Sequence, residues 1–236
     1  MMKKIALLLL FSVVSLTSCD QKLLDTVLNS GSGVLTNADI ANGLKQALEK
    51  GVDASVTYLS KENGYYDSVY KILLPPEAQK VTSKLRAIPG FGNLEEEAIK
   101  RINKATEDAA SKAGPIFLNA ITQMTFTDVK NILMGEKNAA TQYLHNKTYQ
   151  ALYDEFKPVL VNSLNKFNAL DYWSDAVGTY NKIPFVEKVN PDLADHVANQ
   201  ALMGLFDLIE KKEYGIRTDI SQRTSDLLRK VFAQQD

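Results

Sequence analysis

The polar residues best placed to do chemistry are found in pairs and short runs on predicted helices. Asn103 and Glu107 are four residues apart in a segment rich in alanine, and Glu213 and Arg217 repeat that spacing near the C-terminus. Residues four apart share one face of a helix. Polar groups among small apolar residues are expected to be partly buried, and buried polar groups need partners. The candidate residues are Asn103, Glu107, Thr141, Gln142, Tyr143, Glu213 and Arg217.

Two interpretations of this set remain open. In the favoured one, the polar groups form a hydrogen-bonded network that fixes the register of packed helices. In the other, they line a small polar pocket for a ligand or a weak catalytic centre, with Glu107 supported by Arg217 or Gln142. The two are distinguished by geometry, because a catalytic carboxylate must be accessible in an open pocket.

Cys19 is the only cysteine, and it closes the run Leu16-Thr17-Ser18-Cys19. Lys3 and Lys4 precede an apolar stretch from Ile5 to Val14, which is the order of a secretory signal sequence. The stretch is shorter than the roughly 20 residues that span a bilayer as a helix. The run resembles a bacterial lipobox, so Cys19 is predicted to carry a diacylglyceryl group, with an acyl chain such as palmitate on its new amine.

This assignment divides the chain into three parts. Residues 1–18 are predicted to be a signal peptide, and residues 19–36 a lipidated N-terminus and flexible tether that contains Ser30-Gly31-Ser32-Gly33. Residues 37–236 are predicted to form one domain. Lipid would hold the protein to the outer membrane or to the periplasmic face of the inner membrane, and Asp20 does not decide between them. No cysteine remains for a disulfide, so the domain must be held by its core.

Composition and motifs exclude several classes of protein. The formal charge is −1, which gives no basic surface for nucleic acid. The chain has no HExxH zinc motif, no GxSxG elbow and no phosphate-binding glycine loop. Its two histidines, His145 and His196, lack the spacing of a zinc site, and each is interpreted as a surface or packing residue. No cofactor, metal or catalytic residue is assigned, and the balance is against an enzyme.

Hydrophobic periodicity predicts an all-α fold, a single compact and irregular bundle of about seven to nine helices. Pro158 is expected to kink or divide the longest helix, and Leu73-Leu74, which precedes a proline, is expected to be extended. The predicted helices cover about 36–63, 76–88, 93–113, 115–124, 127–135, 138–167, 172–180, 192–210 and 220–232.

Short motifs that occur in a fixed order along the chain resemble one family. They are Gly43-Leu44-Lys45-Gln46-Ala47-Leu48, Leu74-Pro75, Asn103-Lys104-Ala105-Thr106-Glu107, Ala139-Ala140-Thr141-Gln142-Tyr143, Gly204-Leu205-Phe206 and Glu213-Tyr214-Gly215-Ile216-Arg217. Together they resemble the bacterial envelope family catalogued as domain of unknown function 4197, over about 39–232. The resemblance implies a helical, exported or lipid-anchored protein and no established activity. Lys104 and Thr106 depart from the arginine and alanine that are common in related chains.

Three functions follow from these observations as hypotheses. The first is a membrane-tethered helical module of the cell envelope that binds or scaffolds a protein or small molecule. The second is a carrier of a lipid or other amphiphile in a cavity between helices. The third is a hydrolase-like enzyme centred on Glu107. The residues expected to line the carrier's cavity are Phe117, Met124, Phe156, Phe167 and Phe206.

Overall fold

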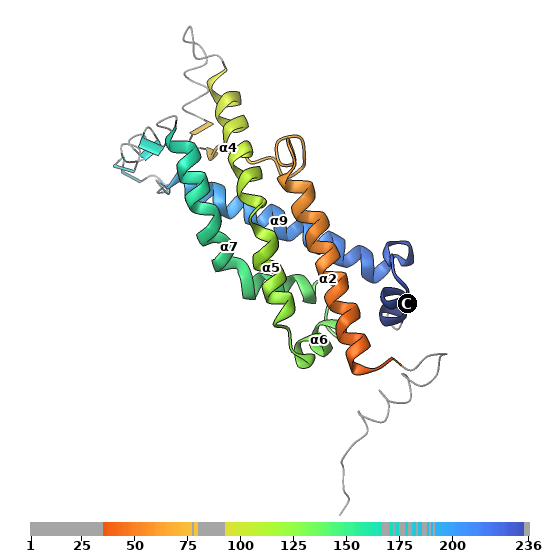
Figure 1. Cartoon of the computed structure of the whole chain (residues 1–236). Helices are drawn as coiled ribbons and strands as arrows, with labels where there is room; N and C mark the ends of the chain where they lie inside the picture. The colour runs from red at the N-terminus through yellow and green to blue at the C-terminus, as the bar shows by residue number, and fades with distance from the viewer. Residues whose placement is uncertain are drawn as a thin grey trace, which may run out of the picture. The chain divides into compact units, whose positions relative to one another are not determined.

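The computed structural model describes residues 35–76, 78–79, 93–166, 170–171, 173–174, 178, 181–182, 184–185, 188, 190 and 192–233. Residues 37–236 form one compact unit and residues 1–36 another. The predicted signal peptide, Cys19 and nearly all of the tether lie outside the described residues, as do nearly all of the predicted helix 76–88 and part of the predicted helix 172–180. The described part of the chain contains helices and no strand, which confirms the all-α prediction (Figure 1).

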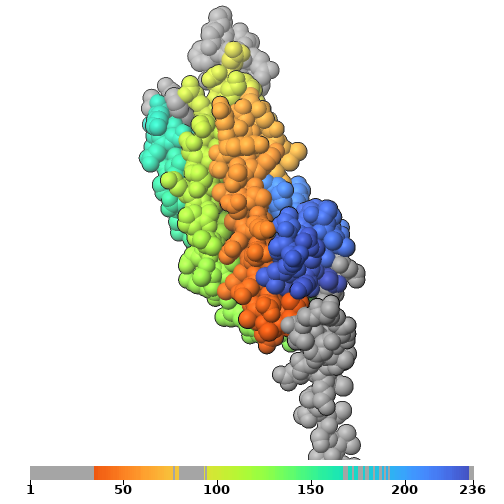
Figure 2. Space-filling view, turned by 45° about the vertical axis from the view of Figure 1, so that its right-hand side comes forward, coloured from red at the N-terminus to blue at the C-terminus, as the bar shows by residue number. Residues whose placement is uncertain are grey.

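Helix α2 (Asn37–Ser60) is the central contact element of this unit. Its buried apolar residues recur every three to four positions, as an amphipathic helix requires. In the described chain it packs against α4 (Leu94–Ala110), α5 (Ala113–Thr122), α6 (Phe126–Leu133), α9 (Leu193–Thr218) and α10 (Asp226–Phe232). Figure 2 shows α2 in orange beside α4 and α5 on one face, with the blue C-terminal segment against its other side.

Small residues let α4 and α5 approach their neighbours closely. Ala105, Ala109 and Ala113 are fully buried, and α4 packs against both α2 and α7 (Ala139–Asn165). Leu73 and Leu74, which precede Pro75, lie in a short stretch without regular secondary structure, and the extended conformation expected of them stays a prediction.

Helix α6 (Phe126–Leu133) begins one residue earlier than the sequence predicted. Thr125 is its N-cap: the Thr125 hydroxyl accepts a hydrogen bond from the Asp128 N–H, and the Asp128 carboxylate accepts one from the Thr125 N–H. The sequence pattern placed the start of this helix at Thr127 and Asp128. The reciprocal pair requires a spacing of three residues, and Thr125 satisfies it.

Helices α7 and α9 are antiparallel. Residues near the start of α7 contact the end of α9, and residues farther along α7 contact its start. Pro158 lies inside α7 and does not divide it. Helix α9 continues to Thr218, beyond the end predicted at Glu210, because its buried face continues through Ile216 to Arg217.

The chain ends in a short 3-10 helix (Ile220–Gln222) and then α10, where the sequence predicted one helix. Ser225 separates the two, because its hydroxyl caps α10 by accepting a hydrogen bond from the Leu228 N–H. Helix α10 packs closely on α2 at Gly43, where an added Cβ would lie 2.6 Å from a methyl carbon of Val231. Glycine is therefore required there for space. Among the described residues, no helix has the length and apolar character of a bilayer span.

Candidate functional site

Asn103 and Glu107 hold the segment between α2 and α4. The Asn103 side-chain oxygen accepts from the Ile72 N–H at 2.8 Å, and its amide group donates to the carbonyls of Ile72 (2.9 Å) and Ile99 (2.7 Å). Glu107 is 1% exposed, and its carboxylate accepts from the Tyr65 N–H at 3.4 Å. Both side chains therefore satisfy buried backbone groups at Tyr65 and Ile72, which lie outside regular secondary structure.

Burial changes the ionisation of Glu107. Desolvation raises the pKa of its carboxyl, and hydrogen bonds from the backbone of Tyr65 and Asn63 lower it by a smaller amount. The net pKa is above the ordinary value. A raised pKa is also a property of catalytic acids, but this carboxylate is enclosed by the protein and bonded to main-chain N–H groups. The geometry therefore favours the structural interpretation of Glu107.

Glu213 and Arg217 form a second buried group, at the junction of α6 and α7. The Glu213 carboxylate accepts from the N–H groups of Ala140 (3.0 Å) and Thr141 (2.7 Å) and from the Thr141 hydroxyl (2.8 Å). Ala140 and Thr141 are in the first turn of α7, and the Asn138 N-cap makes no side-chain capping bond. Glu213 thus supplies from α9 the negative charge that a helix N-terminus favours.

Arg217 interacts with the C-terminal end of α6. Its guanidinium donates to the Ile132 carbonyl at 2.8 Å, in the last turn of α6, and pairs with the Glu213 carboxylate at 2.9 Å. Helix C-termini carry partial negative charge, so a cation there is favourable. The pair lies beside a largely apolar cavity of about 20 Å³, which is room for about one water. This cavity is too small for a ligand.

The other predicted residues have separate positions. Gln142 is exposed and donates to the Asn138 side chain, and the half-buried Tyr143 hydroxyl donates to the Ala120 carbonyl at 3.5 Å. The structure therefore brings Thr141, Glu213 and Arg217 together in one group. Asn103 and Glu107 form a separate group, which contacts the backbone between α2 and α4. Sequence reasoning missed Arg223, which is buried and donates to the carbonyls of Ile216 and Arg217. No sequence motif marked that residue.

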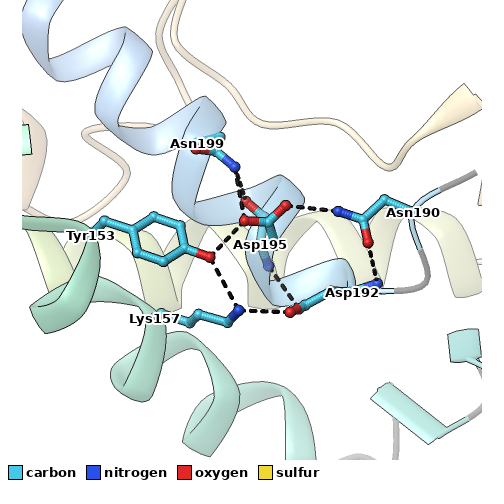
Figure 3. Close-up of polar contacts among 6 residues, drawn as sticks. All are labelled: Tyr153, Lys157, Asn190, Asp192, Asp195 and Asn199. Carbon is cyan, nitrogen blue, oxygen red and sulfur yellow. Dashed lines mark hydrogen bonds and ion pairs between the residues drawn. The ribbon is translucent and has the colours of Figure 1, made fainter. Parts of the chain in front are cut away.

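A ladder of polar contacts joins α7 to the start of α9 (Figure 3). The Lys157 ammonium donates to the Asp192 carboxylate at 2.7 Å and to the Tyr153 hydroxyl at 3.1 Å, and Tyr153 donates to Asp195 at 2.6 Å. Asn190 and Asn199 donate to the same Asp195 carboxylate. All these groups point toward one another, so the ladder fixes the two helices and leaves little capacity for a ligand.

The charges in this ladder are mutually stabilised. Hydrogen bonds to Asp192 and Tyr153 raise the pKa of Lys157. Desolvation opposes ionisation of Asp192, but Lys157 and the backbone N–H groups of Asp195 and Ala194 outweigh it and lower the Asp192 pKa. The hydrogen bond to Asp195, followed by desolvation, raises the pKa of the Tyr153 hydroxyl. Tyr153 therefore stays protonated and is not an activated phenolate.

A groove opens on the surface farther along the same helix pair. It lies between the Tyr149–Asn199 hydrogen bond and the Thr141–Glu213 contact and has a volume of about 910 Å³. Phe206, which is 6% exposed, lies at its base and contacts the buried Phe117 edge-on at 5.7 Å between ring centroids. The lining residues are Thr141, Gln142, His145, Asn146, Tyr149, Asn199, Met203, Phe206, Asp207 and Glu210.

Aromatic rings form one wall of this groove. The His145 ring centroid is 4.8 Å from that of Phe206 and 4.9 Å from that of Tyr149. Met203 is 62% exposed on the opposite helix. The sequence identified His145 only as a surface or packing residue, because the groove depends on the pairing of α7 with α9. A helical period of four residues could have grouped 141, 145 and 149, but not their partners on α9.

The residues proposed for an amphiphile cavity belong mostly to the core. Phe117 and Phe156 are completely buried, and Met124 is 5% exposed. Phe167 lies outside the described residues. Only Phe206 lines the groove. These aromatic residues therefore act mainly as packing groups, and the open space is at the surface between α7 and α9.

Fold and site together define a class: an all-α domain whose buried polar groups support the fold and whose surface bears a groove between α7 and α9. The chain belongs to the family described as protein of unknown function DUF4197, whose model matches residues 34–233. The resemblance inferred from the sequence motifs is thereby confirmed. No curated protein and no solved structure shows significant similarity to this chain.

Proposed function

We propose that this protein is a non-enzymatic binding module of the bacterial cell envelope, held to a membrane by lipid on Cys19. Its ligand site in this proposal is the groove between α7 and α9. The observation that carries the proposal is the groove itself, with a volume of about 910 Å³ and an aromatic base. Ligand sites are typically concave, largely apolar and about 300–1,000 Å³ in volume, with a few polar groups for orientation.

The arrangement of the buried charges supports binding over catalysis. Glu107, the acid on which the hydrolase hypothesis depends, is enclosed and bonded to the backbone of Tyr65. Glu213 and Arg217 neutralise each other and bond to helix ends. A general acid or base must reach the reacting group, and none of these three can do so without opening the core.

The groove also distinguishes a binding module from a lipid carrier. A carrier would enclose acyl chains between helices, where Phe117 and Phe156 instead fill the core. The groove is bordered by exposed polar side chains, including Gln142 and Asn146, which suit a ligand that stays in contact with water. Native mass spectrometry of the protein is expected to show no co-purified lipid in the groove-bearing domain beyond the N-terminal anchor.

The proposed anchor rests on the lipobox and on the lone cysteine. In the Cys19→Ala variant, expressed as the full chain in a bacterial host, we expect either loss from the membrane fraction or an uncleaved precursor. Each acyl methylene contributes about 0.8 kcal/mol of membrane affinity, so loss of the lipid removes a large attraction. Intact mass of the wild-type chain provides the second measurement. An unmodified sulfur, or no cleavage before Cys19, would contradict the anchor.

The groove is tested by photo-crosslinking in the intact envelope. A photoreactive amino acid replaces Met203 in the groove or, as a control, Leu118, which is 51% exposed on α5. We expect specific products from position 203 and none from position 118, with the 203 products lost when Tyr149→Ala removes part of the groove wall. Equal products from both positions, or none from position 203, would overturn the proposal.

A further inference from the structure

The charged residues that line the α7–α9 groove are both acidic. Two carboxylates, Asp207 and Glu210, line it, and no lysine or arginine of the described chain does so. Asp207 is already engaged: Lys211 pairs with it at 2.6 Å, and the Tyr70 hydroxyl donates to it at 2.8 Å. Glu210, which is exposed, has no ion-pair partner among the described residues. The groove therefore carries an uncompensated negative charge at its edge.

The engaged pair cannot neutralise Glu210. Hydrogen bonds to Asp207 and Tyr70 raise the pKa of Lys211 to about 12 and hold its ammonium beside them. Although desolvation opposes it, the hydrogen bonds from Lys211 and Tyr70 lower the Asp207 pKa, so this carboxylate stays ionised. Lys211 is one residue from Glu210, and side chains at adjacent helical positions do not face each other.

The aromatic wall is complementary to the same kind of ligand. Aromatic ring faces attract cations within about 6 Å of the ring centroid, and a guanidinium plane also stacks on rings. On the α7 side, the His145 ring centroid lies 4.8 Å from that of Phe206, which is one turn before Glu210 on α9, and Tyr149 lies at the other end of the groove, against Asn199. A planar cation bound beside His145 and Phe206 would thus have aromatic rings on one side and the Glu210 carboxylate one helical turn away. A carboxylate can also accept two parallel hydrogen bonds from one guanidinium.

The length of the groove indicates how the cation is presented. It follows α7 from Thr141 to Tyr149, about 12 Å at a rise of about 1.5 Å per residue. An extended chain advances about 3.3 Å per residue, so about four residues would span it. The exposed side chain of Met203 and the buried ring of Phe206 provide apolar contacts along this length.

We propose that the groove binds an extended segment of a partner protein through an arginine side chain that sits between the aromatic wall and Glu210. This inference rests on the proposed function, because it specifies the ligand of the same groove. It goes beyond that function by assigning the sign and shape of the ligand. Apolar side chains flanking the arginine would lie over Met203 and Phe206.

The experiment uses the full lipidated chain in a non-ionic detergent and two capped six-residue peptides. One peptide alternates leucine and arginine, and the other replaces each arginine with citrulline, which keeps the shape and removes the charge. Fluorescence anisotropy at low salt measures both affinities. The arginine peptide is expected to bind at least about 5-fold more tightly than the citrulline peptide, and salt is expected to reduce the difference, since surface charges are screened over about 10 Å at 0.1 M.

Two matched variants locate the effect. Glu210→Gln is expected to reduce the affinity for the arginine peptide about 2- to 5-fold, which is the usual contribution of one exposed ion pair. The affinity for the citrulline peptide is expected to stay unchanged. Glu155→Gln makes the same change in net charge at an exposed position of α7 that does not line the groove, and it is expected to change neither affinity.

Equal binding of the two peptides would overturn the inference, as would an equal loss in Glu210→Gln and Glu155→Gln. Failure of both peptides to bind would also overturn it. These results leave the proposed function standing if position 203 still crosslinks in the envelope and position 118 does not. Absence of the position-203 products would instead remove the proposed function, and the inference with it.

Discussion

The Glu213 carboxylate and the Arg217 guanidinium lie 2.9 Å apart within the core, and each also bonds to the end of a different helix. Glu213 accepts from the first turn of α7, and Arg217 donates to the last turn of α6. The signs match the partial charges of those helix ends. One turn of α9 thereby fixes the junction between two consecutive helices.

Removal of the negative partner from this pair is expected to destabilise the fold strongly. In Glu213→Gln, Arg217 keeps its charge in a buried position without a counter-ion, which typically costs about 3–5 kcal/mol. Urea unfolding followed by circular dichroism measures the change. Glu210→Gln, three residues earlier on the exposed face of the same helix, is the control and should stay within about 0.5 kcal/mol of wild type. Equal urea midpoints of unfolding for Glu213→Gln and Glu210→Gln would contradict a stabilising role for the buried pair.

Asn103→Ala is expected to loosen the segment before Pro75. The substitution leaves the N–H and the carbonyl of Ile72 without their side-chain partner, and each unsatisfied buried group costs about 1–3 kcal/mol. Hydrogen exchange should therefore increase at Ile72 as the unfolding free energy falls. Lys104→Ala, at the exposed neighbouring position, should leave exchange at Ile72 unchanged. Unchanged exchange in Asn103→Ala would show that the bonds do not hold the segment.

Glu107 is expected to make stability fall as pH rises. Its folded pKa is above the unfolded value of about 4.3, so the fold favours the protonated carboxyl, and this advantage is lost as pH rises through the folded pKa. The glutamine of Glu107→Gln would keep the acceptor for the Tyr65 N–H without the charge. The unfolding free energy of Glu107→Gln minus that of wild type should thus increase above about pH 4.3. The matching difference for Glu155→Gln should be flat, and a flat result for both would contradict the assignment.

The Lys157–Asp192 ion pair is expected to stabilise the fold at neutral pH and to lose this effect in acid. The Asp192 pKa is lowered in the fold, so its contribution is present above the unfolded value of about 3.9 and disappears as pH falls through the folded pKa. Asp192→Asn retains a side chain that caps α9 and removes the charge. Both partners are a third or more exposed, so the loss at neutral pH should not exceed about 1 kcal/mol. The variant and wild type should converge as pH falls below the folded pKa of Asp192, and a difference that persists there would exclude the ion pair as its cause.

The sequence was sufficient where a property depends on neighbours along the chain. Hydrophobic periodicity predicted the helix at about 36–63, and the buried face of α2 includes Leu44, Leu48 and Val52. The ordered motifs predicted the family. The lipobox at Cys19 is equally local, and it remains a prediction because it lies outside the described residues. Each of these signals is contained within a few turns of helix or a short run of residues.

Only the tertiary structure decided what the polar residues do. Glu213 and Thr141 are 72 positions apart, and nothing in either segment indicates that one caps the helix of the other. The groove likewise exists because α7 and α9 are antiparallel, which places His145 near Phe206. The end of α9 was predicted too early because the buried partners of its last turn lie on α6 and α7. Long-range packing satisfies these charges, and a local pattern cannot contain that information.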